Sequence, residues 1–175
     1  MFFRFFIWIL FLIGGGISGV YLDNIWFINY WNNLSFHLIS FIIGVFFLFL
    51  VLRISKNTGR FLAKNGREGV LPRMQTNVLV QSGIYAYMRH PMHLGLMLFP
   101  LAIAFLLGSL SFILIIAPIE IIFILIMIYL IEEPEAIKKF GESYKNYRKI
   151  TPGFCLTINC LKSLIQKPIS YKEYS

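Results

Sequence analysis

Four long apolar runs limit what this chain can fold into. They cover residues 5–22, 34–52, 92–107 and 111–131 and are dominated by aliphatic and aromatic side chains. About 20 helical residues cross a hydrocarbon core about 30 Å thick, and the helix satisfies its backbone hydrogen bonds internally there. With 58% hydrophobic residues, the chain is no ordinary soluble domain. We therefore predict an all-α, integral membrane helical bundle of about four transmembrane helices, with residues 1–175 forming a single domain.

The first apolar run has two interpretations. One Arg precedes residues 5–13, and small residues follow, which is compatible with a cleaved signal peptide. However, apolar residues resume at Val20 and further runs follow, so we favour a retained transmembrane helix. Its glycines would let another helix approach closely. They are Gly14, Gly15, Gly16 and Gly19.

Positive charge is concentrated between the second and third runs. Residues 53–89 hold seven Lys or Arg and only Glu68 as an acid. We expect them to form a long polar loop, in which residues 57–72 are irregular or form a surface-lying helix. Such an excess of positive charge is typical of a cytosolic segment. We therefore expect a multi-pass protein of the inner, or cytoplasmic, membrane with both termini in the cytosol. The net charge of +8 then reflects membrane topology and not nucleic-acid binding.

The two cysteines indicate no metal or redox motif. Cys155 and Cys160 do not have the spacing of a zinc or thioredoxin motif, and no second Cys/His pair accompanies them. We place them in a cytosolic tail, where thiols stay reduced. We therefore expect ordinary tail residues and no metal site.

A basic and aromatic cluster, residues 77–95, precedes the third apolar run. Within it Arg89 and His90 stand directly before Pro91. Proline suits the first turn of a helix, where its missing N–H is no loss. The cluster therefore predicts a helix entrance at the membrane surface, with a guanidinium and imidazoles beside it.

A second polar cluster, residues 132–149, follows the fourth run and begins with the acidic pair Glu132 and Glu133. We expect one amphipathic helix here, and Gly141 within it hints at close backbone approach. Two polar clusters on one side of a membrane are suited to hold a cytosolic ligand. The apolar face of the helix follows a 3-4-3 spacing. It comprises Ile137, Phe140, Tyr144 and Tyr147.

The two clusters together resemble a known family. The pattern L-V-x-S-G-x-Y-x-x-x-R-H-P-x-x-x-G, followed about 40 residues later by E-E and F-G-x-x-Y-x-x-Y, is similar to the isoprenylcysteine carboxyl methyltransferase and phospholipid methyltransferase group. The similarity covers roughly residues 77–152, under half of the chain. The matching residues are Leu79, Val80, Ser82, Gly83, Tyr85, Arg89, His90, Pro91, Gly95, Glu132, Glu133, Phe140, Gly141, Tyr144 and Tyr147.

The resemblance implies an integral-membrane enzyme that uses S-adenosylmethionine to methylate a lipid-like substrate from the bilayer. Methyl transfer from a sulfonium is an in-line displacement, so the protein supplies mainly proximity and alignment. A carboxylate should hold the cofactor's ammonium or ribose hydroxyls, and tyrosines should supply stacking or hydroxyl contacts. The expected cofactor-binding residues are Asn77, Val78, Leu79, Val80, Tyr85, His90, Pro91, Met92, His93, Glu132, Glu133, Tyr144 and Tyr147.

Two departures from the family pattern leave the methyl acceptor open. His93 replaces the usual Tyr of R-H-P-x-Y, and Ile128 stands where enzymes acting on prenylcysteine carry an Arg. A phospholipid amine, another lipid carboxylate or a small apolar nucleophile all remain open. An amine would need a base. The candidate catalytic residues are His90, Glu132 and Glu120.

Glu120 itself has two interpretations. It stands near the middle of the fourth apolar run, two residues after Pro118. An ionisable group at that depth is costly and is by default a functional candidate. The alternative is a protonated carboxyl bonded to a neighbouring helix or to the carbonyl that Pro118 leaves unpaired.

Two other functions remain as alternatives. Steroid 5α-reductase-type enzymes, which use NADPH, are similar around an R-H-P-x-Y-x-G element, but they place an acidic residue after the Gly, where this chain has Leu96. The second alternative is a non-catalytic membrane subunit with the same fold. Binding of S-adenosylmethionine would separate the methyltransferase from both.

Overall fold

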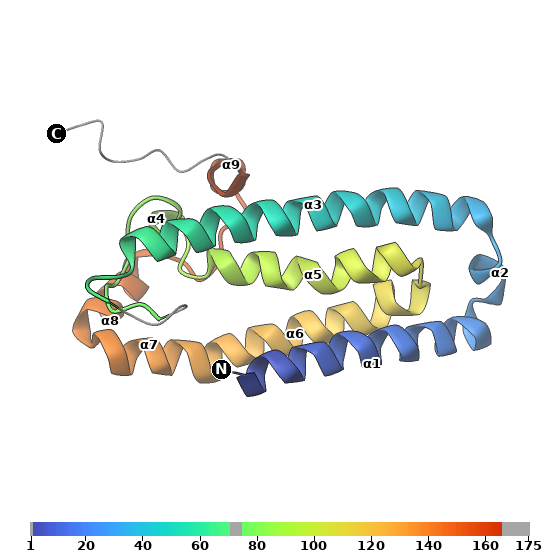
Figure 1. The fold of residues 1–175 in the computed structure, drawn as a ribbon, viewed down its shortest axis with the longest axis horizontal. Coiled ribbons are helices and arrows are strands. Elements are labelled where there is room, and N and C mark those ends of the chain that lie inside the picture. The colour runs from blue at the N-terminus through green and yellow to red at the C-terminus, as the bar shows by residue number, and fades with distance from the viewer. Residues whose placement is uncertain (1, 71–74, 166–175) are drawn as a thin grey trace. The chain divides into compact units, whose positions relative to one another are not determined.

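The structure is a computed structural model that describes residues 2–70 and 75–165, with side chains from Phe6 onward. The described residues form helices and connections without a strand, which confirms the all-α prediction for this part of the chain (Figure 1). The helices are α1 (Phe2–Trp26), α2 (Ile28–Trp31), α3 (Leu34–Asn65), α4 (Ile84–Tyr87), α5 (Pro91–Leu107), the π-helical segment η1 (Phe112–Ile116), α6 (Ala117–Met127), the π-helical segment η2 (Ile128–Glu132), α7 (Glu133–Phe140), α8 (Glu142–Ile150) and α9 (Ile158–Ile165).

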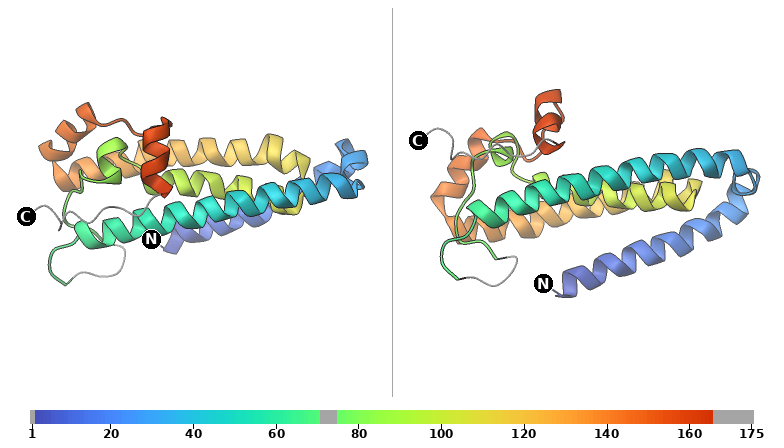
Figure 2. Two further views of the ribbon diagram at one scale, coloured as in Figure 1. Left: turned by 90° about the horizontal axis from the view of Figure 1, so that it is seen from above. Right: turned by 45° about the horizontal axis from the view of Figure 1, so that its top comes forward.

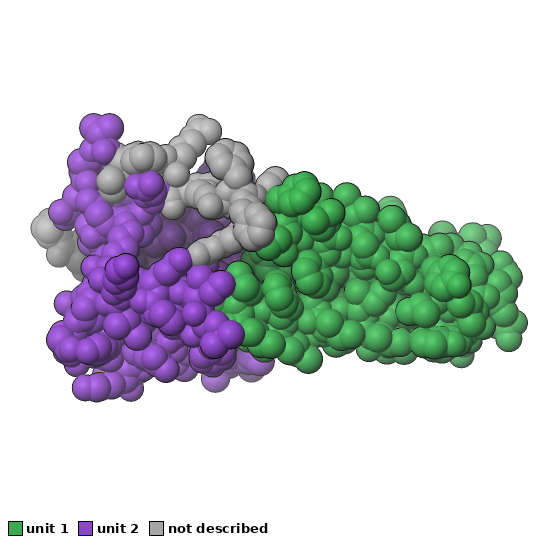
Figure 3. All heavy atoms as spheres, turned by 90° about the horizontal axis from the view of Figure 1, so that it is seen from below, with its two compact units in different colours: residues 1–51, 96–127 green, residues 52–95, 128–175 purple. Residues whose placement is uncertain are grey.

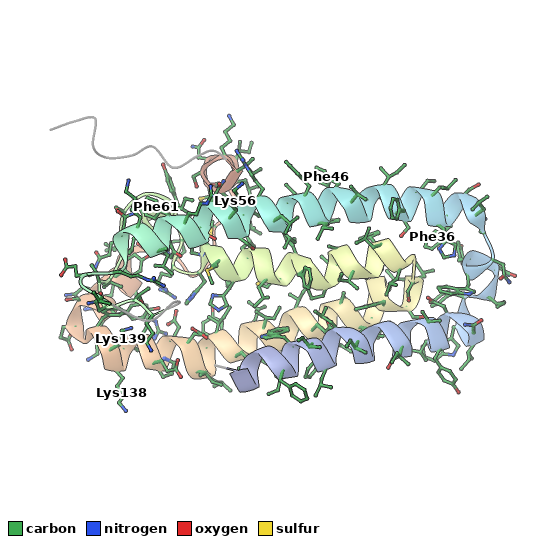
Figure 4. The ribbon with its side chains drawn as sticks, viewed as in Figure 1. Phe36, Phe46, Lys56, Phe61, Lys138 and Lys139 are labelled. Atoms are coloured by element: carbon green, nitrogen blue, oxygen red, sulfur yellow. A yellow bond between two sulfur atoms is a disulfide. The ribbon has the colours of Figure 1, made fainter. Side chains whose placement is uncertain are left out.

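Three helical stretches among the described residues are long and apolar enough to cross a membrane. They are Phe6–Trp26, Leu34–Asn65 and the continuous stretch Phe112–Phe140. The stretch α5 is also apolar but has only 17 residues, about 25 Å of helix. Large apolar side chains on these helices are exposed, such as Phe46, which projects from α3 (Figure 4). Such exposure fits a lipid environment, and the protein is an integral membrane protein.

The chain divides into two compact units (Figure 3). The first comprises residues 1–51 and 96–127, and the second comprises residues 52–95 and 128–175. The first unit therefore holds most of the apolar helices, and the second holds both polar clusters. Each is described by itself below.

Within the first unit, glycines bring helices close together. Of the α1 glycines predicted to allow this, Gly15 and Gly19 do so, whereas the prediction is wrong for Gly14, where an added Cβ would meet no atom within 4 Å. A Cβ added at Gly19 would lie 2.7 Å from the Ser109 hydroxyl, and one at Gly44 would lie 2.6 Å from the backbone nitrogen of Leu106. Gly108, at φ +64, makes the short turn that follows α5. The turn joins α5 to the next helical stretch as a helical hairpin.

Within the second unit, helix α3 is longer than the sequence analysis predicted. It continues to Asn65, so the prediction of a polar loop over residues 53–89 is wrong for its first 13 positions. The physical reason is a buried face whose members recur at helical spacing. Its residues are Ile54, Thr58 and Phe61.

The single amphipathic helix predicted for residues 132–149 is also wrong. The chain changes direction between α7 and α8 at Gly141 (Figure 2), whose φ is +58. A Cβ at Gly141 would meet no atom within 4 Å, so close approach is not what places a glycine here. Its backbone conformation is one that side-chain-bearing residues rarely adopt.

The tail has a disulfide and hydrogen bonds to α3 that the sequence does not predict. Cys155 and Cys160 are joined by a disulfide, so the prediction of two reduced tail residues is wrong. The last carbonyls of α9 accept hydrogen bonds from side chains of α3: Asn57 Nδ2 donates to Leu164 O at 2.9 Å, and Arg53 Nε donates to Ile165 O at 2.9 Å. These contacts fix α9 against the extension of α3.

Candidate functional site

A backbone pairing positions the Arg89–His90 dipeptide between α4 and α5. The Arg89 N–H donates to Pro152 O at 3.0 Å, and the His90 N–H donates to Gly153 O at 3.1 Å. A Cβ at Gly153 would lie 3.5 Å from Arg89 Nη2, so the segment after α8 lies in van der Waals contact with the guanidinium. Because Met88 is fully buried just before it, the dipeptide is held at both sides.

Glu133 joins the two polar clusters through its carboxylate. Arg89 Nη2 lies 2.6 Å from Glu133 Oε1, and His90 Nε2 lies 3.0 Å from the same oxygen. Arg148 Nε lies 3.2 Å from Oε2. The side chain of Glu133 is only 2% exposed. A buried carboxylate is tolerated when several charged and hydrogen-bonding groups compensate for lost hydration, as they do here.

Arg89 also closes the C-terminus of α8. Its Nη1 donates to the carbonyls of Arg148 and Thr151 at 2.9 and 3.0 Å. The last carbonyls of a helix lack intrahelical partners and carry partial negative charge, so a guanidinium is a suitable donor there. One side chain therefore connects the start of α5 with Glu133 of α7 and the end of α8.

His90 is held as a neutral imidazole. Burial lowers its pKa below the usual value, and the nearby Glu133 carboxylate only partly offsets that effect. The neutral ring donates its Nε2 proton to Glu133, which leaves Nδ1 as the acceptor nitrogen. The His93 ring lies 5.5 Å away and the Phe154 ring 5.9 Å away, so aromatic surfaces line the imidazole.

Three buried tyrosines complete the site. Tyr147 donates its hydroxyl to the backbone carbonyl of Tyr85, which fixes α8 to α4. The Tyr85 ring stacks on Phe61 at 6.2 Å. Burial, together with the Glu133 charge, raises the pKa of Tyr144 to about 12, and burial raises the pKa of Tyr85 and Tyr147 further. All three phenols therefore stay protonated at neutral pH.

Four buried polar atoms of the site make no hydrogen bond to the described residues. They are the hydroxyls of Tyr85 and Tyr144, Arg89 Nε and Glu133 Oε2, the last having only the ion-pair contact with Arg148. Buried polar atoms normally have partners, so an unbonded phenol and carboxylate oxygen fit a ligand that carries an ammonium group and hydroxyls. These polar groups thus suit the polar parts of S-adenosylmethionine.

The second unit contains every predicted cofactor-binding residue, but they differ in exposure and contacts. Asn77 is exposed, and its side-chain amide is bonded at 2.8 Å to both the N–H and the carbonyl of Glu68. Val80 is buried beside Phe61 and Tyr85. Val78, Leu79, His93 and Glu132 are half-buried, and Met92 is exposed.

The acidic pair divides between two environments. Glu133 carries the contacts with Arg89, His90 and Arg148, whereas Glu132 ends η2 and is half-buried. The candidate catalytic residue Glu120 belongs to the first unit. Of the acidic and basic candidates, His90 and Glu133 therefore lie together beside the three buried tyrosines.

Sequence reasoning missed Arg148 and the segment after α8. Arg148 lies in the last turn of α8, and Thr151, Pro152 and Gly153 supply carbonyls to Arg89 and His90. The Thr-Pro-Gly triplet marks a helix end, but nothing in it predicts a pairing across about 60 residues. Within the described residues, no group of three His, Cys, Asp or Glu side chains could hold a metal ion.

Comparison with known proteins gives two findings on this chain. Residues 34–143 match the phospholipid methyltransferase family model. The chain is 36% identical over 81 residues to protein-S-isoprenylcysteine O-methyltransferase of Schizosaccharomyces pombe, covering 46% of this chain and 34% of the yeast protein. The chain thus spans about a third of the length of that relative. No solved structure gives a significant match. Because the family model covers more than half of the chain, the protein belongs to the phospholipid methyltransferase family.

Proposed function

We propose that the protein is an S-adenosylmethionine-dependent methyltransferase that methylates a lipid-like or isoprenoid-linked substrate at the cytosolic membrane face. Its family and the name of its yeast relative both support methyl transfer. Neither comparison favours the NADPH-dependent reductase of the steroid 5α-reductase type. The single observation that carries the proposal is the Glu133 carboxylate, which joins the two sequence clusters in one buried site.

The residues of the site suggest how the cofactor is held. Glu133 Oε2 would accept a hydrogen bond from the ammonium group, and the Tyr85 hydroxyl would bond a polar atom of the ribose or adenine. Arg89 and Arg148 keep the carboxylate ionised and in place. When bound, S-adenosylmethionine supplies an electrophilic methyl group on its sulfonium. The protein contributes alignment of a nucleophile with that methyl, which accounts for a large share of such rate enhancements.

His90 is the group best placed to take a proton from an amine acceptor. Its Nε2–H is committed to Glu133, so Nδ1 is the basic position. A neutral imidazole at pH 7 is available as a base. A carboxylate or thiolate acceptor would need no base, and His90 would then serve only to position Glu133.

Ile128 bears on which class of methyl acceptor the site can bind. This residue is 1% exposed and apolar, so it offers no cation for a substrate carboxylate. The yeast relative acts on S-isoprenylcysteine by its name, and that substrate stays possible if another cation serves it. A phospholipid amine is the acceptor for which the site has a ready base.

The topology that we propose has four spans and both termini in the cytosol. Helix α5, at 17 residues, is then the shortest span, which local thinning of the bilayer accommodates. The seven Lys and Arg of residues 53–89 support a cytosolic site at the inner membrane. Cysteine-accessibility labelling at Lys56 in sealed vesicles tests this: labelling from the outer side of the membrane would contradict the topology.

Methyl transfer itself is tested with radiolabelled S-adenosylmethionine and the purified full chain. One set of vesicles contains phosphatidylethanolamine, and the other contains an S-farnesylcysteine analogue. We expect label in the organic extract from at least one set. Alkaline hydrolysis releases volatile methanol from a methyl ester but not from an N-methyl group, so it assigns the acceptor. No incorporation from either set by a folded protein that binds S-adenosylhomocysteine would contradict both proposed acceptors.

A further inference from the structure

A groove between α1 and α6, within the first unit, carries an acidic side chain at its inner wall. Its volume is about 340 Å³, at the lower end of the range of roughly 300–1,000 Å³ found for ligand pockets. Its walls are mainly apolar. The lining residues are Leu10, Phe11, Gly14, Gly15, Ser18, Ile116, Ile119 and Glu120.

The packing of α1 on α6 makes room for the Glu120 carboxyl. Phe11 stacks on Phe123 at 4.8 Å and holds the two helices together. A Cβ at Gly15 would lie 2.7 Å from Glu120 Oε1, so a glycine is needed at this point of α1. Gly14 is different, because a Cβ there would meet no atom within 4 Å. The groove is therefore open beside Gly14 and closed by the carboxyl beside Gly15.

Glu120 is buried without a partner. The residue is 1% exposed, and neither carboxyl oxygen makes a hydrogen bond to the described residues. The bond to a neighbouring helix, or to the carbonyl left unpaired by Pro118, is thus not formed. A carboxyl in an apolar, membrane-embedded setting is costly unless a donor or a cation reaches it. Its position on the groove wall leaves a ligand as the source of that donor.

We propose that this groove binds a single-chain amphiphilic amine from the bilayer, with its ammonium group on Glu120 and its alkyl chain along the apolar wall. An amine is favoured over a neutral donor because it can take the proton of the buried carboxyl and form an ion pair with it, whereas an unpaired carboxylate in hydrocarbon is costly. The modest volume suits one alkyl chain better than the two of a diacyl lipid. Ser18 adds a hydroxyl that accepts a second hydrogen bond from the ammonium group.

The test uses a photoreactive alkylamine and the alkyl alcohol of the same chain length, each added to the purified full chain in detergent. After illumination, labelled peptides are identified by mass spectrometry. We expect the amine to label residues 10–18 and 116–120 about tenfold more than the alcohol does, as one charge-assisted contact predicts. Equal labelling by both probes, or amine labelling confined to other peptides, would overturn the proposal.

Two variants separate the carboxyl from the groove. Glu120→Gln keeps the shape and should reduce amine labelling to the level of the alcohol. Gly14→Leu should fill the groove and reduce labelling by both probes, whereas Gly59→Leu, which also points into open space but lies on α3, should not. Retained S-adenosylhomocysteine binding reports that each variant is folded. Undiminished amine labelling of Glu120→Gln would refute the role of the carboxylate.

Discussion

Glu133→Gln is expected to abolish S-adenosylhomocysteine binding and to destabilise the protein by about 3–5 kcal/mol, the usual cost of breaking a buried ion pair. The amide keeps the size of the side chain but removes the charge that compensates Arg89, whose side chain is only 7% exposed. It also offers one acceptor oxygen where the carboxylate has two for Arg89, His90 and Arg148. Thermal unfolding followed by circular dichroism, with calorimetric titration of the cofactor product, measures both effects.

Glu142→Gln is the matched control for this substitution. Glu142 is exposed and pairs with Lys145 one helical turn away, at 2.6 Å. Exposed pairs of this kind contribute little to stability, so no measurable change in melting temperature or binding is expected. If Glu133→Gln behaved like Glu142→Gln, the buried cluster would not organise the site.

Gly83→Ala is expected to destabilise the protein more than Gly141→Ala, although the two glycines have nearly the same backbone conformation. Gly83 has φ 59 and ψ −128, and Gly141 has φ 58 and ψ −133. Backbone strain of about 1–3 kcal/mol is therefore common to both alanine variants. A Cβ at Gly83 would also lie 2.4 Å from Phe61 Cζ, whereas a Cβ at Gly141 would meet nothing within 4 Å.

The difference between the two variants reports the contact of Gly83 with Phe61. We expect Gly83→Ala to cost a further 1–3 kcal/mol or so, typical of overpacking, and to weaken cofactor binding by displacing Phe61 from Tyr85. Their unfolding midpoints are compared in the same detergent. Adding Phe61→Leu to Gly83→Ala should recover part of the loss, because residues in contact are coupled. Equal destabilisation by both alanines would refute the packing argument.

The parts of the fold that the sequence predicts are those fixed by composition and local chemistry. Long apolar runs demand helices in a bilayer, and three of them have the required length in the structure. Pro91 begins α5, as its missing N–H and fixed φ predict. The turn at Gly108 also depends on local chemistry, because its positive φ suits a glycine. The family resemblance, carried by short motifs, agrees with the family model.

The missed features depend on contacts between distant residues. The polar sequence of residues 53–65 does not predict a helix, because the stability of this helix comes from burying one of its faces in the second unit. The sequence also cannot tell which glutamate of the pair meets Arg89, since η2 is a π-helix and changes the rotation expected for an α-helix. The pairing of Pro152 and Gly153 with the Arg89–His90 dipeptide is equally non-local.

The disulfide illustrates the same limit for covalent structure. The spacing of Cys155 and Cys160 matched no metal or thioredoxin motif, and the assumed cytosolic location argued for thiols. In the structure the start of α9 brings the two Cα atoms to 6.0 Å, a distance compatible with a bridge. The fold of the tail around α9 decides this, and the spacing of the two cysteines alone does not reveal it.

Calorimetric titration of the detergent-purified full chain with S-adenosylhomocysteine tests the central claim most directly, with NADPH as the comparison ligand and Glu133→Gln as the site control. The account predicts saturable micromolar binding of S-adenosylhomocysteine to the wild-type protein, no binding of NADPH, and no binding of either ligand to Glu133→Gln. Binding of NADPH alone, or of neither ligand by wild-type protein shown to be folded, would contradict it.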